Sequence, residues 1–182
     1  MSGYRSYRPC RQLLPGLLAL VTFFSCVSSK DGVKSMRPSP PAADTSMVRT
    51  ALVSINYSSP AVKKRKLLGG LIPIGKVWRT GANEATIFYT DKDLLVMGEV
   101  LPKGKYAFFT KASKDQWQII FNKEWDQWGA YNYDQNKDAL RIEVLPYAVD
   151  RFEERMLIKF KEEQLMFHWG NLQYTLELEE KD

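Results

Sequence analysis

Polar and apolar residues alternate along most of the chain beyond residue 48. A period of two is typical of strands with one face toward a core and the other toward water. The clearest alternating segments are residues 51–57, 86–90, 140–145, 156–160 and 172–178. Turn-forming residues separate the segments roughly every ten positions. This spacing predicts an all-β fold, an antiparallel β-sandwich.

Two local patterns add detail to that prediction. Residues 60–68 are rich in Lys, Arg and Leu, which favours one short helix there. Tyr106 follows a Pro/Gly corner at the start of an apolar strand. This arrangement resembles a tyrosine corner, whose hydroxyl bonds back to nearby backbone, and it favours a Greek-key order. We therefore expect a structural role for Tyr106 and not a ligand contact.

The first 26 residues have a different character. Three arginines and no acidic residue precede an apolar stretch at 13–24, which is too short to span a bilayer as a stable helix. The pattern predicts a signal peptide over residues 1–25. Cys26 follows the apolar core and a small residue, as at the processing site of bacterial lipoproteins. We expect lipidation of Cys26, with ordinary secretion and a free thiol as the alternative.

Processing changes both the cysteine count and the charge. Cys10 would be removed, so the mature chain could form no intrachain disulfide. Three of the 26 Lys and Arg residues and none of the 21 acids precede Cys26, so the net charge falls from +5 to 23 minus 21, or +2. The modest charge and a secreted location argue against nucleic acid as a partner.

The remaining sequence divides into a tether and one domain. Residues 26–47 are rich in Ser, Pro and Ala, which predicts a flexible tether that cannot bury enough apolar surface to fold. Residues 48–182 have the size of a single domain.

Several motifs in this domain are shared with a known family. They are Leu68–Pro73, Gly75–Thr86, Leu101–Tyr106, Trp128–Tyr131 and Asp138–Arg141. Together they resemble an uncharacterised family of bacterial envelope proteins, the domain of unknown function twenty-nine eleven, over roughly residues 49–180. The resemblance implies a secreted all-β domain. It implies no reaction, cofactor or catalytic residue.

The run from Trp78 to Thr86 is the main candidate site. Arg79, Asn83 and Glu84 surround a glycine-containing turn just before an apolar strand. Loops held by a rigid sheet are where binding groups usually lie. Arg79 would either clamp a ligand carboxylate or phosphate or pair with Glu84 and tie the loop to the sheet.

Aromatic residues supply a second candidate surface. Trp125, Trp128, Tyr131 and Tyr133 fall within nine residues at a spacing that does not fit a strand. Such rings either stack on a ligand or close one end of the sandwich. We select Trp128 and Tyr131 as stacking residues, and add Arg141 to the predicted ligand-binding set.

The sequence gives little support for a metal site or for a catalytic site. His168 is the only histidine and lies between aromatic residues in a predicted strand, which excludes a multi-histidine metal centre and favours a structural role. Residues 134–138 begin like a calcium loop but lack its glycine and final glutamate, so a solvated turn is predicted. We expect neither a metal nor a cofactor. The acids available for a hydrolytic pair are Glu84, Asp126, Asp134 and Glu143.

The sequence therefore predicts a protein of the bacterial cell envelope, anchored by lipid at Cys26 or secreted, that touches membrane only through that lipid. Its predicted function is non-catalytic binding of a small polar or carbohydrate-like ligand. A hydrolase using acids near the 78–86 loop and a structural or assembly protein are the alternatives. Oligomeric state stays open.

Overall fold

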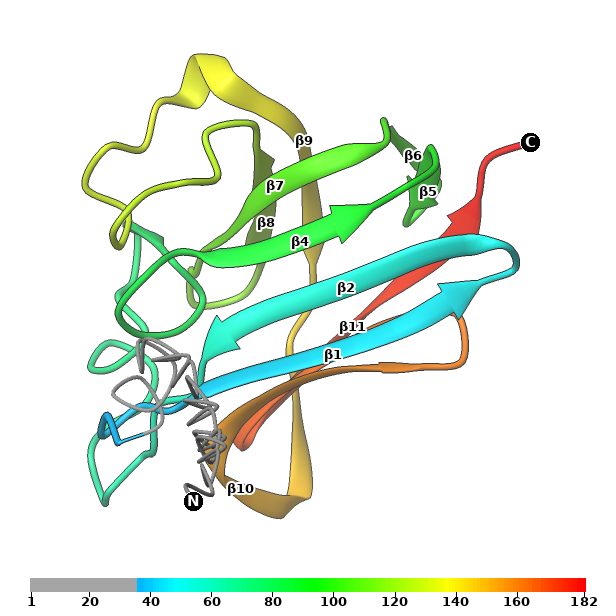
Figure 1. Ribbon diagram of the computed structural model, residues 1–182. Helices are drawn as coiled ribbons and strands as arrows, with labels where there is room; N and C mark the ends of the chain where they lie inside the picture. The colour runs from blue at the N-terminus through cyan, green and yellow to red at the C-terminus, as the bar shows by residue number, and fades with distance from the viewer. Residues whose placement is uncertain (1–35) are drawn as a thin grey trace, which may run out of the picture.

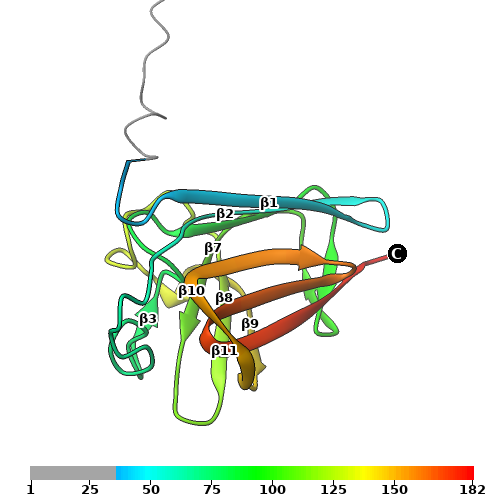
Figure 2. The same ribbon diagram turned by 90° about the horizontal axis from the view of Figure 1, so that it is seen from below.

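Two antiparallel β-sheets packed face to face form the fold (Figure 1). The computed structural model describes residues 36–182; the predicted signal peptide, Cys26 and the first part of the tether lie outside this range. Figure 2 shows the two layers, with β1 and β2 in one and β10 and β11 in the other. The predicted all-β sandwich is confirmed.

The larger sheet has seven strands in the order β1-β2-β4-β7-β8-β9, with β3 paired to β7. These strands are β1 (Pro41–Val48), β2 (Ala51–Ser58), β3 (Val77–Trp78), β4 (Thr86–Thr90), β7 (Gly104–Lys111), β8 (Trp117–Asn122) and β9 (Asp138–Val144). The smaller sheet has the order β10-β11-β5-β6, with β5 (Leu94–Val96), β6 (Glu99–Leu101), β10 (Tyr147–Lys161) and β11 (Gln164–Glu180). Neighbours in the larger sheet mostly follow chain order. The observed order is thus closer to a meander than to the Greek key that the sequence favoured.

Alternation along the strands places the core between the sheets. On β2, Val53 and Ile55 are fully buried, whereas Leu52 and Asn56 are exposed. Phenylalanines from β4 and β8, the strands on either side of β7, meet edge to face in the same layer, with the Phe88 and Phe121 ring centroids 5.2 Å apart. Each fully buried side chain of this size contributes about 1.5–3 kcal/mol.

The N-terminal boundary of the domain differs from the predicted one. β1 begins at Pro41, inside the stretch assigned to the tether, and pairs along its whole length with β2. Only Val48 of this edge strand is buried, so its small and polar residues resemble a linker in sequence. The Asp44 carboxylate accepts a 2.7 Å hydrogen bond from the Phe160 amide and joins β1 to β10. A proline is tolerated at the first position of such a strand.

The prediction of a short helix at residues 60–68 is wrong. That stretch is an irregular loop in which Lys63 and Lys64 have positive φ, 47° and 58°, outside the right-handed helical region. Leu67 and Leu68 pack against the core, which holds the loop without helical hydrogen bonds. The helical turn within residues 36–182 is the 3₁₀ segment η1 (Gln135–Lys137). No helix in the described part of the chain is long and apolar enough to cross a membrane.

Two structural roles predicted from sequence are confirmed. The Tyr106 hydroxyl donates a 2.7 Å hydrogen bond to the Pro102 carbonyl, which is the predicted tyrosine corner. His168 is only 4% exposed and its Nε2 lies 3.0 Å from the Arg151 carbonyl oxygen. Both side chains are therefore part of the packed scaffold.

The connections gather at the two ends of the sandwich (Figure 1). The start of β1 and the loops at 59–76, 79–85 and 123–134 lie at one end. The β1–β2 and β10–β11 turns and the C-terminus lie at the other. The predicted binding loops therefore share one end of a rigid double sheet.

Candidate functional site

The 79–85 loop is held rigidly by its own polar groups. The Thr80 hydroxyl lies 2.8 Å from that of Thr110, and the Thr86 hydroxyl donates to the Thr80 carbonyl at 2.8 Å. The Trp78 indole donates to the Gly81 carbonyl at 3.2 Å, while its ring stacks on Trp169 with 6.0 Å between centroids. Because these groups are buried, the loop enters β4 in one fixed path.

The 123–134 loop lies against the 79–85 loop as a short antiparallel pair. The Ala85 amide donates to the Gln127 carbonyl, and the Gly129 amide donates to the Asn83 carbonyl, both at 3.1 Å. Between these two bonds, Glu84 and Trp128 form an isolated β-bridge. The structure therefore brings together the two regions that the sequence could only propose separately.

Arg79 lies in this pair of loops and has no acidic partner among residues 36–182. Its side chain is partly buried, and Nε has no hydrogen-bond partner in the part of the chain that the structure describes. No ion pair with Glu84 forms, so the expected alternative of an Arg79–Glu84 tie is wrong. Burial lowers the pKa of the Arg79 guanidinium, and the nearby Tyr131 opposes that change.

Gly129 lies close to both the Tyr131 ring and the Arg79 guanidinium. A Cβ atom placed on Gly129 would lie 3.1 Å from the Tyr131 ring and 3.7 Å from Nη1 of Arg79. The absence of a side chain at this position thus lets the Tyr131 ring approach the loop backbone beside the guanidinium.

The four clustered aromatic residues divide into two pairs. Trp128 is 54% exposed and Tyr131 is 82% exposed. Trp125 and Tyr133 instead pack on the outer face of the larger sheet, where Tyr133 meets Phe109 edge to face at 5.4 Å. Trp128 and Tyr131 are therefore exposed enough to stack on a ligand. Trp125 and Tyr133 are packed against the protein itself.

Residues ahead of β1 occupy the polar side of the site. Nη1 of Arg37 donates to both carboxylate oxygens of Glu84, at 2.8 and 3.0 Å. The Asn83 side-chain amide donates to the Ser39 carbonyl at 3.3 Å. Sequence reasoning missed Arg37 because it lies in the predicted tether, and no local spacing connects it to Glu84.

Arg141 belongs to a different network. Its Nε donates to the Asp138 carboxylate at 2.6 Å, and its guanidinium also bonds the Tyr133 hydroxyl. Asn122 donates to the same carboxylate at 2.7 Å. Burial, followed by the hydrogen bond to Asp138, raises the pKa of Tyr133 to about 12. Arg141 therefore ties β9 to the 123–134 loop, and the predicted ligand contact has no support from these bonds.

Two of the four candidate hydrolytic acids, Asp134 and Glu143, are held in local hydrogen bonds away from the 79–85 loop. Asp134 caps η1 by accepting from the Asn136 amide at 2.9 Å. Glu143 accepts from the Gln116 amide at 2.7 Å. Within residues 36–182, no group of three or more His, Cys, Asp or Glu side chains is placed to hold a metal ion.

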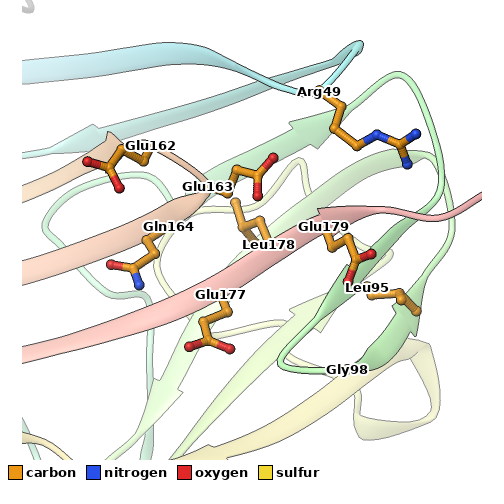
Figure 3. Close-up of a pocket in the computed structure, with 9 residues that line it drawn as sticks. All are labelled: Arg49, Leu95, Gly98, Glu162, Glu163, Gln164, Glu177, Leu178 and Glu179. Carbon is orange, nitrogen blue, oxygen red and sulfur yellow. The ribbon is translucent and has the colours of Figure 1, made fainter.

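Two hollows lie near the two ends of the sandwich. One of about 420 Å³ borders Glu84 and Arg37. The other, of about 570 Å³, lies at the far end and carries Glu162, Glu163, Glu177 and Glu179 on its lining (Figure 3). None of the residues predicted to bind a ligand lines this second hollow.

Comparison with known proteins identifies the domain but no activity. No curated protein and no solved structure matches the chain. One family model, described as "Protein of unknown function (DUF2911)", matches residues 39–178. Since this match spans most of the chain and nearly all of the described sandwich, the protein belongs to the DUF2911 family, as the sequence motifs predicted.

Proposed function

We propose that the domain binds a small polar or carbohydrate-like ligand that carries a carboxylate or phosphate, without catalysing a reaction. The observation that supports this most is the partly buried Arg79, whose Nε has no partner among the described residues. Buried charged groups in folded proteins are normally paired or hydrogen-bonded. A ligand oxyanion would supply the missing partner, and the planar guanidinium suits a bidentate contact.

Trp128 and Tyr131 would flank the bound ligand. Both rings are exposed and both belong to the loop that is hydrogen-bonded to the Arg79 loop. Amphipathic rings of this kind stack on the apolar faces of sugars and other flat ligands. Hydrogen bonds to a charged group contribute about 1.5–3 kcal/mol each, and association itself opposes binding by several kcal/mol. We therefore expect a Kd in the range of about 1 μM to 1 mM.

The neighbouring polar contacts favour binding over hydrolysis. Glu84 is held by Arg37, Asp134 caps a turn and Glu143 accepts from Gln116. An assembly role, in which Arg79 would act as internal glue, is disfavoured because its guanidinium makes no ion pair or hydrogen bond to residues 36–182.

The test is a thermal-shift and calorimetric titration with glucuronate, glucose 6-phosphate and uncharged glucose. Glucuronate or the phosphate should raise the Tm of wild type, and glucose should not. Arg79→Met should abolish the effect, whereas the control Arg151→Ala, which changes an exposed arginine, should keep it. An equal response of Arg79→Met and wild type would refute the proposal.

We also propose that the mature protein is a lipoprotein of the bacterial envelope, anchored at Cys26 by a tether that ends near Pro40. The support is the signal-like N-terminus, with Cys26 directly after its apolar stretch. Labelling of cells with an alkyne fatty acid should tag the wild-type protein but not Cys26→Ser. Equal labelling of the two proteins would exclude this anchor.

A further inference from the structure

Arg37 is held between two groups that together recognise an organic cation. Its guanidinium bonds the Glu84 carboxylate, and its central carbon lies 5.9 Å from the centroid of the Trp128 ring. A carboxylate beside an indole face attracts ammonium and guanidinium groups through charge and through the ring quadrupole. The Arg37 guanidinium thus lies between Glu84 and Trp128, in a space that we call the recess.

The recess borders an open hollow of about 420 Å³. Ala43, Asn56 and Ile87 lie in register across β1, β2 and β4 and line the hollow on the outer face of the sheet. The remaining lining residues are Arg37, Pro41, Ala42, Tyr57, Ser58, Glu84 and Ala85. The hollow therefore has small and apolar walls, with the ion pair at its charged side. Its volume falls within the range of about 300–1,000 Å³ that is usual for small-molecule sites.

The contact that fills the recess is exchangeable. The Arg37 and Glu84 side chains are 29% and 38% exposed, and ion pairs open to water in this way are weak. Arg37 also precedes the first paired residue of β1, Pro41. Its side chain can leave without breaking any bond between β1 and β2.

We propose that the recess and the hollow form a second binding site, which takes a small amphipathic cation such as an alkylammonium or alkylguanidinium. The ligand's charged group replaces Arg37 between Glu84 and Trp128, and its apolar part lies over Ala43 and Ile87. This site goes beyond the anion site because Arg79 is not among the residues that line the hollow, although the two sites share Trp128. Arg37 therefore competes with the ligand's charged group for the space between Glu84 and Trp128.

An NMR titration with n-hexylammonium, 1-hexanol and hexanoate tests the proposal. Hexylammonium should shift the backbone amide signals of Ala43, Asn56 and Ile87, and the two matched probes should bind at least about tenfold more weakly. Arg37→Ala removes the competitor and should tighten hexylammonium binding about two- to fivefold, while Glu84→Gln should weaken it about tenfold or more. Trp128→Leu should weaken it about two- to fivefold.

Controls separate this site from the anion site and from misfolding. Arg79→Met should leave hexylammonium binding unchanged, so loss of one site is distinguishable from loss of the other. Amide spectra with retained dispersion will show that each variant is folded. The proposal is wrong if hexanol binds as well as hexylammonium, or if neither Arg37→Ala nor Glu84→Gln changes the affinity in the stated direction.

Discussion

The Gly129 amide donates a 3.1 Å hydrogen bond to the Asn83 carbonyl, and both residues have positive φ, 66° and 59°. This bond joins the loop that carries Arg79 to the loop that carries Trp128 and Tyr131. Asparagine tolerates the left-handed region better than most residues, and glycine enters it without strain. The placement of the Arg79 guanidinium relative to the aromatic rings thus depends on the left-handed backbone of Asn83 and of Gly129, which are hydrogen-bonded to each other.

Gly129→Ala should disturb the site as well as the fold. An alanine here must keep a backbone φ of 66°, which is strained for a residue with a side chain. Its Cβ would also lie 3.1 Å from the Tyr131 ring. We expect a loss of about 1 kcal/mol in the free energy of unfolding, and weaker binding of the anionic ligand because Tyr131 must move. Chemical denaturation and calorimetric titration measure the two effects.

The matched control for Gly129 is Gly98→Ala. Gly98 has φ of 84° but no atom within 4 Å of the added Cβ. This variant should lose similar stability and keep full ligand affinity. Equal affinity in both alanine variants would show that Tyr131 contributes nothing to binding.

Replacing the two arginines of the predicted set should have opposite effects on stability. Arg79 has no acidic partner among the described residues, so Arg79→Met removes the penalty for burying its charge and should leave stability unchanged or raise it by about 1 kcal/mol. Arg141 bonds Asp138, so Arg141→Met should lower stability by about 1–3 kcal/mol. Urea denaturation of both variants checks the pair. A large loss of stability in Arg79→Met would instead indicate a structural role.

Tyr106→Phe should weaken the corner after β6. It removes the 2.7 Å hydrogen bond to the Pro102 carbonyl and keeps the ring. We expect a loss of about 1 kcal/mol and a Tm lower by about 2–4 °C. Tyr89→Phe is the control, because Tyr89 lies on the exposed face of β4 and its hydroxyl makes no hydrogen bond to residues 36–182. Equal Tm values for the two variants would contradict the role given to the corner.

The C-terminal end of β11 should be sensitive to acid. Hydrogen bonds from Lys92 and then from Thr50 lower the pKa of Glu180 to about 2. Since the folded-state pKa lies below the ordinary value of 4.5, the stabilisation is complete above about pH 4.5 and disappears as the pH falls toward 2. The difference in Tm between wild type and Glu180→Gln should therefore shrink over this interval.

Glu99→Gln provides the comparison for the acid experiment. Glu99 is exposed, and its carboxylate makes no ion pair with any residue in the described range 36–182. The free energy of unfolding of Glu99→Gln should stay within about 0.5 kcal/mol of that of wild type at each pH. A Glu180 difference that persists unchanged at pH 2 would contradict the assigned ion pair.

Sequence periodicity predicted the strands whose two faces differ most. β2 is an example, because apolar Val53 and Ile55 alternate with residues that face water. β1 was missed since most of its residues, from Pro41 to Ser46, are small or polar on both faces, and its pairing depends on a neighbouring strand. Residues 147–153 of β10 were missed for a related reason: they are largely exposed and their pairing with β11 is irregular.

The candidate site was only partly predictable because its contacts are not local. The motif around Arg79 and the aromatic run around Trp128 were both visible in sequence, and the structure joins them. The contact of Glu84 with Arg37 was not visible: within the motif, Arg79 was one expected partner of Glu84, whereas the structure places Arg37, 47 residues away, on its carboxylate. Polar pairs of this kind are determined by the folded backbone and leave no periodic signal.

The first described residues and the C-terminus lie at opposite ends of the sandwich. Ser39 contacts Asn83 beside the candidate site, while Asp182 pairs with Arg49 at the far turn. Immobilisation on a biosensor chip through a C-terminal biotin would present Arg79 and Trp128 to the flowing analyte. Attachment at the segment just ahead of β1 would hold the chip surface beside these residues and restrict ligand access, so the choice of attachment decides whether a ligand screen can succeed.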